Sequence, residues 1–286
     1  MRTWAFLFSA ATIAVSVGST AAAQPARNLL EACAEGRLDA AQDLLRSGVD
    51  PNVAGEDGET PLLAAARRGN AALLKFLISA GANLNARRWN GEIALHAAVA
   101  AGQETAVDLL LRSGIDRNAR QSRRGQTALH YAAADGRVSI IQALVAAGAE
   151  VDAKSNSGAS PLWLASQGGH PAAMAALIAA GANAEAAGPE SFRPLHLAVR
   201  SCTTSVVQPL IAARSDLAAR TESGSTPLHL AVTQNCLSVV QLLVEAGADP
   251  NAADAKSQMP LDIARKQRRL REIAAYLEQK VSTQKP

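Results

Sequence analysis

The chain has 286 residues, of which 48% are hydrophobic but only 3% aromatic, and its formal net charge at pH 7 is +3. Small aliphatic side chains in this proportion suit thin, closely packed helices better than a globular core anchored by large aromatic residues. The charge is modest and its signs are interleaved, so the composition does not point to nucleic acid as a partner.

The N-terminal residues have the pattern of a signal peptide. Arg2 carries a positive charge, residues 5–17 are apolar, and residues 20–23 end in the small-x-small pattern that signal peptidase needs. We therefore expect residues 1–23 to be removed and the mature chain to be exported. A membrane anchor is the alternative, but spanning takes about 20 apolar residues and this run is shorter. No later segment is long and apolar enough to span a membrane, so we expect no span in the mature chain.

The rest of the chain repeats one phrase at a nearly fixed interval. Its marker leucine recurs every 33 residues, with a single interval of 34, at Leu62, Leu95, Leu129, Leu162, Leu195, Leu228 and Leu261. Self-similarity at this period predicts one elongated domain built from stacked small repeats. The extra residue falls in residues 121–124, where we expect a longer exposed loop tip.

Local signals within one repeat predict two short helices and a projecting loop. Gly58 suits a tight turn, Thr60 can cap a helix, and Pro61 stands at the first helical position, where its missing N–H costs nothing. The first helix should end at Gly69 and the second at Gly81. The second helix carries an apolar stripe at helical spacing, formed by Leu73, Leu74, Leu77 and Ile78. Neither helix can bury its stripe alone, so the repeats must stack and residues 82–91 must project as a finger.

These features resemble the ankyrin repeat. The sequence Thr-Pro-Leu-His at residues 226–229 and Glu-Ala-Gly-Ala-Asp-Pro-Asn-Ala at residues 245–252 carry the resemblance most clearly. It implies an all-α solenoid of helix-turn-helix repeats with projecting finger loops. The expected boundaries of the single domain at 24–280 are an N-terminal cap at 26–55, six full repeats at 56–253 and a C-terminal cap at 254–280, followed by a disordered tail at 281–286.

The histidines occupy repeat positions and do not form a reactive cluster. Four of them follow the marker leucine, namely His96, His130, His196 and His229, while His170 follows a turn glycine. The resemblance implies that the first four bond loop backbone between neighbouring repeats. Nucleophilic catalysis or metal binding needs a histidine beside other reactive groups or ligands, and the glycines are all used in turns or caps. We therefore expect no enzyme activity, no metal site and no cofactor.

Two tryptophans and three cysteines stand out from the repeat pattern. Trp163 replaces the usual histidine, where we expect it to pack against its neighbours. Cys33 occupies a small apolar slot and should remain a buried free thiol. Cys202 and Cys236 fall in the turns of neighbouring repeats, and we expect them to form a disulfide. The alternative is two unpaired thiols one repeat spacing apart, because bonded Cα atoms must lie within about 7 Å.

The repeat that contains Cys202 departs furthest from the pattern. It has Ser191 in place of a turn glycine, Pro209 inside its second helix, and Arg214 in place of the closing glycine. It also carries Arg193 in place of the capping threonine. Such departures cost stability, which a disulfide would offset.

The finger and inner-helix positions suggest where a partner binds. Trp89 sits in a finger, where packing does not require it, among arginines concentrated in the second to fourth repeats. The predicted partner-binding residues are Arg67, Arg68, Arg87, Arg88, Trp89, Arg120, Arg123 and Arg124. The alternative is a basic rim kept for solubility and partly neutralised by nearby carboxylates.

Family resemblance and export together predict the function. We expect a monomeric, non-catalytic scaffold that binds one or more folded proteins, with an acidic patch, through its fingers and inner helix face. The Ala-rich signal sequence looks bacterial, which favours the periplasm, with secretion as the alternative. A secreted effector or a module that binds an anionic ligand is the alternative function.

Overall fold

A computed structural model of the protein describes residues 16–283. Within that range every regular element is a helix, and the chain divides into two compact units, with the boundary between Ile115 and Asp116. The predicted signal peptide, residues 1–23, lies mostly outside the described residues. The last helix reaches Thr283, so the first three residues of the segment expected to be a disordered tail are helical.

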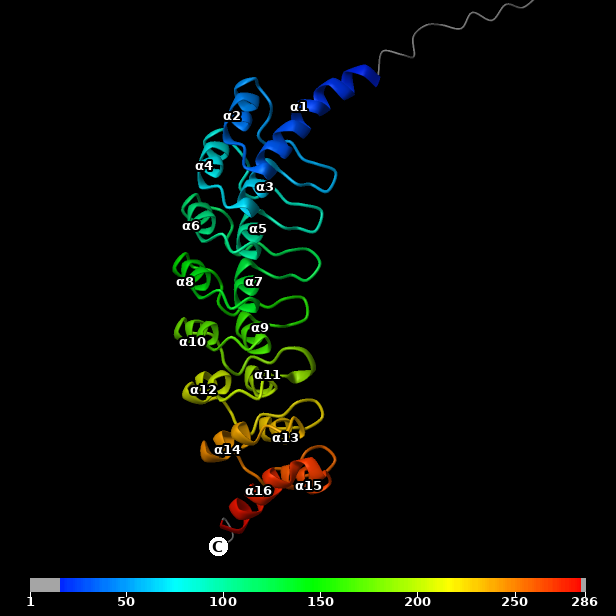
Figure 1. Ribbon diagram of the computed structural model, residues 1–286, viewed down its shortest axis with the longest axis vertical. Helices are drawn as coiled ribbons and strands as arrows, with labels where there is room; N and C mark the ends of the chain where they lie inside the picture. The colour runs from blue at the N-terminus through cyan, green and yellow to red at the C-terminus, as the bar shows by residue number, and fades with distance from the viewer. Residues whose placement is uncertain (1–15, 284–286) are drawn as a thin grey trace, which may run out of the picture. The chain divides into compact units, whose positions relative to one another are not determined.

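The first unit contains six helices among its described residues. In chain order they are α1 (Ser16–Glu35), α2 (Leu38–Arg46), α3 (Pro61–Arg68), α4 (Ala71–Ser79), α5 (Ala94–Ala100) and α6 (Glu104–Arg112). Helix α3 packs against α1 and α5, while α4 packs against α2 and α6. The first and second helices of each pair therefore form two layers, as the upper part of Figure 1 shows.

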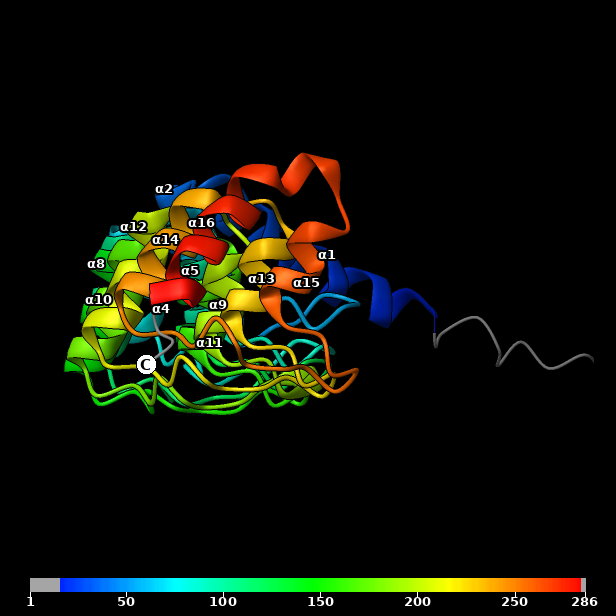
Figure 2. The ribbon, with the colours of Figure 1, turned by 90° about the horizontal axis from the view of Figure 1, so that it is seen from below.

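The second unit continues the same pattern. Its helices are α7 (Ala128–Ala134), α8 (Val138–Ala146), α9 (Pro161–Gly168), α10 (Pro171–Ala179), η1 (Pro189–Ser191), α11 (Pro194–Val199), α12 (Thr204–Ala212), α13 (Pro227–Thr233), α14 (Leu237–Glu245), α15 (Pro260–Arg265), η2 (Arg268–Leu270) and α16 (Arg271–Thr283). The odd-numbered and even-numbered helices again stack in separate layers. In Figure 2 the fingers of this unit project together on one side of its helices.

Short-range signals define the helix ends as the sequence predicts. The hydroxyl of Thr60 accepts a hydrogen bond from the Leu63 N–H at 3.3 Å, and Pro61 begins α3. Gly81 follows α4 with a φ of +87°, a conformation that favours glycine. The core lies between the two helix layers and is built from fully buried leucines such as Leu62, Leu73 and Leu77.

Histidines link successive repeats through both of their ring nitrogen atoms. In His130 and His229 the Nδ1 atom accepts from the backbone N–H of the N-cap residue of its own helix, Thr127 or Thr226, at 3.1 and 3.2 Å. The Nε2–H then donates to a carbonyl of the next finger, at Ala159 and Gln258. Burial lowers the pKa of His196, which makes the same type of contact to Ala219. These contacts agree with a structural role for the histidines.

In α9, Trp163 replaces the histidine and makes the hydrogen bond to the next finger. Its indole Nε1–H donates to the carbonyl of Phe192 at 2.9 Å, 29 residues ahead, which is the same separation as in the His130 and His229 links. The ring is 8% exposed and packs with Leu197 and Phe192. A Cβ at Gly188 would lie 2.4 Å from the indole nitrogen, so the finger approaches the ring too closely for any other residue. Packing was predicted for Trp163, and the hydrogen bond was not.

A disulfide joins the irregular repeat to its successor. Cys202 and Cys236 are bonded with their Cα atoms 5.0 Å apart, the pairing that the sequence favours. Cys202 has a φ of +54° and Arg214 one of +58°, so both adopt a strained left-handed conformation. Helix α12 continues through Pro209. Arg193, in the cap position, instead forms ion pairs with Glu185 and Asp216, at 2.6 and 3.2 Å.

Candidate partner-binding surfaces

Trp89 is the large apolar side chain that stands out on the surface of the described residues. It is 67% exposed and lies at the turn of the finger between α4 and α5. The turn is closed by the Gly91 N–H, which donates to the Arg88 carbonyl at 2.8 Å. The Trp89 N–H donates to the Asp57 carbonyl of the preceding finger at 3.1 Å. The backbone that carries the exposed ring is therefore fixed from both sides.

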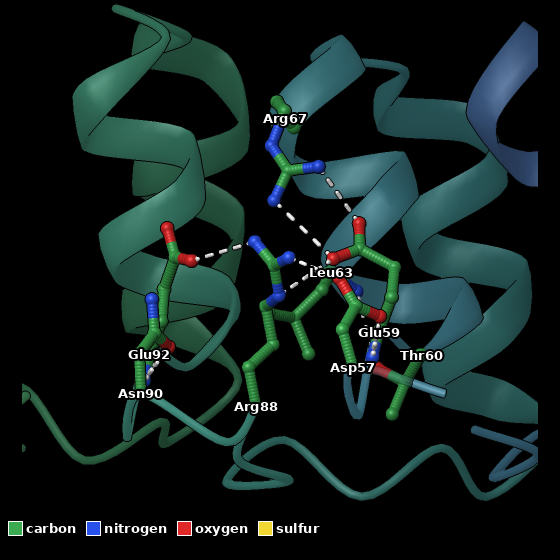
Figure 3. Close-up of polar contacts among 8 residues, drawn as sticks. All are labelled: Asp57, Glu59, Thr60, Leu63, Arg67, Arg88, Asn90 and Glu92. Atoms are coloured by element: carbon green, nitrogen blue, oxygen red, sulfur yellow. Dashed lines mark hydrogen bonds and ion pairs between the residues drawn. The ribbon is translucent and has the colours of Figure 1, made fainter. Parts of the chain in front are cut away.

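Arg88 joins the two fingers beneath Trp89. Its guanidinium pairs with Asp57, lies 3.1 Å from Glu59 and donates to Glu92 at 3.1 Å (Figure 3). The contact between its Nε and Glu59 is an ion contact without hydrogen-bond geometry. Arg67 completes the cluster through two hydrogen bonds to Glu59, at 2.8 and 3.3 Å. These five side chains make one network.

The network removes Arg88 from the set of arginines available to steer a partner. Its side chain is only 20% exposed. Burial acts to lower the pKa of Arg88, but the facing carboxylates outweigh burial and the pKa is raised. The Glu59 N–H and then Arg88 lower the pKa of Asp57. With three carboxylates and two guanidiniums, the network has one net negative charge, so this part of the predicted face is not basic.

The other predicted arginines of the first unit are more accessible. Arg68 is exposed at the end of α3, and Arg87 is exposed in the finger, where one of its guanidinium nitrogens donates to the Gly91 carbonyl at 3.3 Å. Arg67 keeps a side-chain exposure of 45% despite its pairing with Glu59. The predicted arginines of the first unit are therefore partly paired and partly accessible.

The remaining predicted residues belong to the second unit. Arg120, Arg123 and Arg124 are all exposed in the finger that precedes α7. They therefore lie outside the unit that carries Trp89.

The second unit also contains a groove that the sequence did not indicate. Cavities of about 300 and 190 Å³ lie between α9 and α11 and share Gln167, Leu197 and Arg200. Trp163 and Phe192 line the smaller one. The only sequence signal for the groove is the tryptophan that replaces a histidine at position 163.

The described part of the chain contains no group of three or more histidine, cysteine or acidic side chains placed to hold a metal ion. Burial raises the pKa of Cys33 to about 12, so its thiol remains protonated and unreactive. None of the helices within residues 16–283 combines the length and the apolar character that crossing a membrane requires.

The paired helices, the stacked layers and the fingers define a helical repeat protein. The family model described as "Ankyrin repeats (3 copies)" matches residues 29–121, 107–188 and 187–254, and the chain belongs to this family. The structure is similar to the crystal structure of the human ASB11 ankyrin repeat domain, with 27% sequence identity and a TM-score of 0.70. That likeness covers 78% of this chain and 98% of the other. No match was found among curated proteins. Ankyrin repeats are generally scaffolds for protein–protein interaction.

Proposed function

We propose that this chain is a non-catalytic scaffold of the bacterial cell envelope and that it binds a folded protein through the Trp89 finger. The observation that carries the proposal is the exposure of Trp89, at 67%, on a finger whose backbone is held by its neighbour. Tryptophan and arginine are the side chains most enriched among residues that dominate binding energy at protein interfaces.

The rigidity of the finger makes Trp89 a suitable anchor. A flexible loop loses conformational freedom when it binds, and that loss subtracts from the affinity. Here the turn is closed by its own hydrogen bond, and the Arg88 network ties it to the preceding finger. The ring is therefore displayed before a partner arrives, and little ordering remains to be done on binding.

The charged side chains of the first unit favour an acidic partner only in part. Arg68 and Arg87 are exposed and can steer an acidic surface, while the Arg88 network carries one net negative charge and does not. Exposed charges of this kind act mainly on the association rate.

The proposed envelope location rests on the predicted signal peptide, residues 1–23, and the position of Pro25 in α1 agrees with cleavage after Ala23. This helix contains Pro25 in its interior when it begins at Ser16. Interior proline costs about 3 kcal/mol because it removes a hydrogen bond and clashes with the preceding turn. Cleavage after Ala23 would place Pro25 in the first turn, where proline is tolerated. N-terminal sequencing of the mature chain should then begin at Gln24. Cell fractionation tests whether the mature chain stays in the periplasm or reaches the medium.

Site-specific photocrosslinking tests the binding face. In one strain a photoreactive phenylalanine derivative replaces Trp89. In a second strain the same derivative replaces Lys75, which is exposed on helix α4 and lies outside the finger. We expect a defined crosslinked protein from position 89 and none from position 75. Equal products from both positions, or none from position 89, would contradict the proposal.

The affinity of Trp89 variants for the partner then measures how much this side chain contributes to binding. With the crosslinked partner purified, Trp89→Ala should weaken binding by on the order of 2 kcal/mol, or roughly thirtyfold. Trp89→Phe should keep part of this affinity because it retains a large apolar ring. Lys256→Ala serves as a control, because Lys256 is exposed in the finger between α14 and α15. A folded Trp89→Ala variant that binds like the parent would exclude this finger as the anchor.

A further inference from the structure

The finger that breaks the repeat interval has a fixed tip. Its extra residue lengthens the interval from Leu95 to Leu129 to 34. The buried Gln121 organises the tip: its side-chain oxygen accepts from the Arg124 N–H at 2.6 Å, and its backbone carbonyl accepts from the Gly125 N–H at 2.9 Å. The Asn156 N–H of the next finger donates to the Arg124 carbonyl at 2.8 Å. The insertion is therefore an ordered structure, held by two hydrogen bonds within the tip and by one from the next finger.

The arginines of this tip remain available, in contrast to Arg88. Arg123 and Arg124 are both exposed, and no residue in the described range forms an ion pair with either of them. They line a cavity of about 400 Å³ between their own finger and the next, together with Gln126, Ser155, Asn156 and Ser157. No carboxylate lines this cavity, so its charge is entirely positive.

We propose that this cavity binds the phosphate group of a small soluble phosphate ester. Two guanidiniums can each donate paired hydrogen bonds to phosphate oxygens, which is the strongest recognition that arginine offers. The hydroxyl of Ser157, which lies 3.0 Å from the Ser155 hydroxyl, also lines the cavity wall. The amide of Asn156 donates one N–H to the Arg123 carbonyl at 3.4 Å and keeps a second N–H that can donate to a ligand. The inference goes beyond the scaffold function, because it concerns a different finger and a different class of ligand.

The composition of the cavity favours phosphate over a carboxylate. A carboxylate has two oxygens in one plane and is satisfied by a single bidentate arginine. Two arginines with further hydroxyl and amide donors suit a group that has three terminal oxygens and two negative charges. A volume of about 400 Å³ also leaves room for the organic part of the ester, since pockets for small ligands begin at about 300 Å³.

The cavity walls are fixed before a ligand binds. Ser155 is 6% exposed, accepts from the Ala159 N–H at 3.1 Å and lies 3.0 Å from the Ser157 hydroxyl. Gly125 has a φ of +62°, and a Cβ there would lie 2.1 Å from the Asn156 side chain, so the two fingers meet closely at this point. Both walls are therefore held in place, and binding requires little rearrangement of the backbone.

Nuclear magnetic resonance of the mature chain tests the site directly and without a protein partner. Sodium phosphate, glycerol phosphate and sodium acetate are titrated separately at constant ionic strength, and the amide signals of Arg124, Gly125 and Ser157 are followed. We expect saturable shifts with the two phosphates, and a response to acetate at least tenfold weaker. Acetate binding equal to phosphate would overturn the proposed ligand class.

Matched variants distinguish a site from general attraction of anions. Arg123→Ala and Arg124→Ala should each weaken phosphate binding about tenfold or more, since each removes charge-assisted hydrogen bonds. Arg200→Ala removes one exposed arginine from the same unit, away from this cavity, and should leave binding unchanged. Equal effects of the three variants would overturn the proposal. Vesicles that contain phosphatidic acid provide the last arm, and binding to vesicles without binding to glycerol phosphate would overturn a soluble ligand.

Discussion

Loss of the Cys202–Cys236 disulfide should loosen the irregular repeat before the rest of the second unit. The bond closes a sequence separation of 34 residues. The chain-entropy relation for a loop of this length gives a stabilisation of about 4 kcal/mol at 25 °C. This gain is opposed by the left-handed conformations of Cys202 and Arg214, at about 1–2 kcal/mol each, and by Pro209, at about 3 kcal/mol. The repeat therefore depends on its covalent link to the following one.

Hydrogen exchange is the appropriate assay, because a repeat array can open locally without global unfolding. In the double variant Cys202→Ser/Cys236→Ser, amide protection in residues 194–212 should fall about a hundredfold or more, given that 1.4 kcal/mol is a factor of ten. Helix α8 and its neighbour α7 provide the internal reference and should change much less. Adding Arg214→Gly should restore about 1 kcal/mol, since glycine adopts this φ without strain.

Two results would refute this reasoning. Unchanged protection in α11 and α12 of the double variant would show that the disulfide adds nothing to local stability. Equal loss in α7 and α8 would show that the second unit opens as a whole. Cys33 does not complicate the experiment, because it is fully buried and its pKa is raised by burial.

Three further predictions concern side chains that link fingers. Arg88→Ala should lower the urea midpoint of the first unit by the equivalent of about 1–3 kcal/mol, because three partly buried carboxylates lose their shared cation; a loss below 0.5 kcal/mol would contradict the network's importance. Trp163→Phe should cost about 1 kcal/mol or more in thermal unfolding, since the Phe192 carbonyl loses its donor; an unchanged midpoint would refute this role. Because the pKa of His196 is lowered in the folded chain, the unfolded chain takes up this proton at a higher pH than the folded chain does. The contribution of His196 to the unfolding free energy is therefore complete above about pH 6.5 and falls as the pH drops below that value. His196→Gln should flatten the fall in unfolding free energy between about pH 6.5 and 5, and an unchanged slope would assign it to other groups.

Much of the fold could be predicted because its signals act over a few residues. The hydroxyl of Thr60, the ring of Pro61 and the positive φ of Gly81 act on their own or adjacent turns, so the sequence alone defines these helix ends. The marker leucines then define the repeat. The left-handed backbone of Ser191 and Arg214 could also be predicted, because a non-glycine residue that replaces a turn glycine must adopt the same conformation.

The site was harder to predict because its contacts cross from one finger to the next. Arg88 meets Asp57, 31 residues earlier, and the Trp163 indole bonds a carbonyl 29 residues later. The sequence shows that such residues are close, but it does not show which side chains pair. Trp89 could be identified because it lacks a packing role, whereas the neutralised charge of Arg88 depends on side-chain geometry.

Arginines at similar finger positions have different roles because different side chains face them. Arg88 faces Asp57, Glu59 and Glu92 and becomes structural, whereas Arg123 and Arg124 face the neutral side chains of the following finger. What a finger arginine can bind is therefore decided by the charge of its neighbour. A carboxylate introduced on the facing finger should convert the open arginines into a paired cluster.

Asn156→Asp makes that change with almost no change in shape. The side chain lines the cavity beside both arginines, and the backbone N–H that bonds the Arg124 carbonyl is retained. The new carboxylate should pair with Arg123 or Arg124 and repel phosphate, so that phosphate binding weakens about tenfold or more. Circular dichroism should show unchanged helix content, and Asn156→Ser controls for loss of the amide. Phosphate affinity equal to that of the parent would mean that the arginines do not act through this cavity.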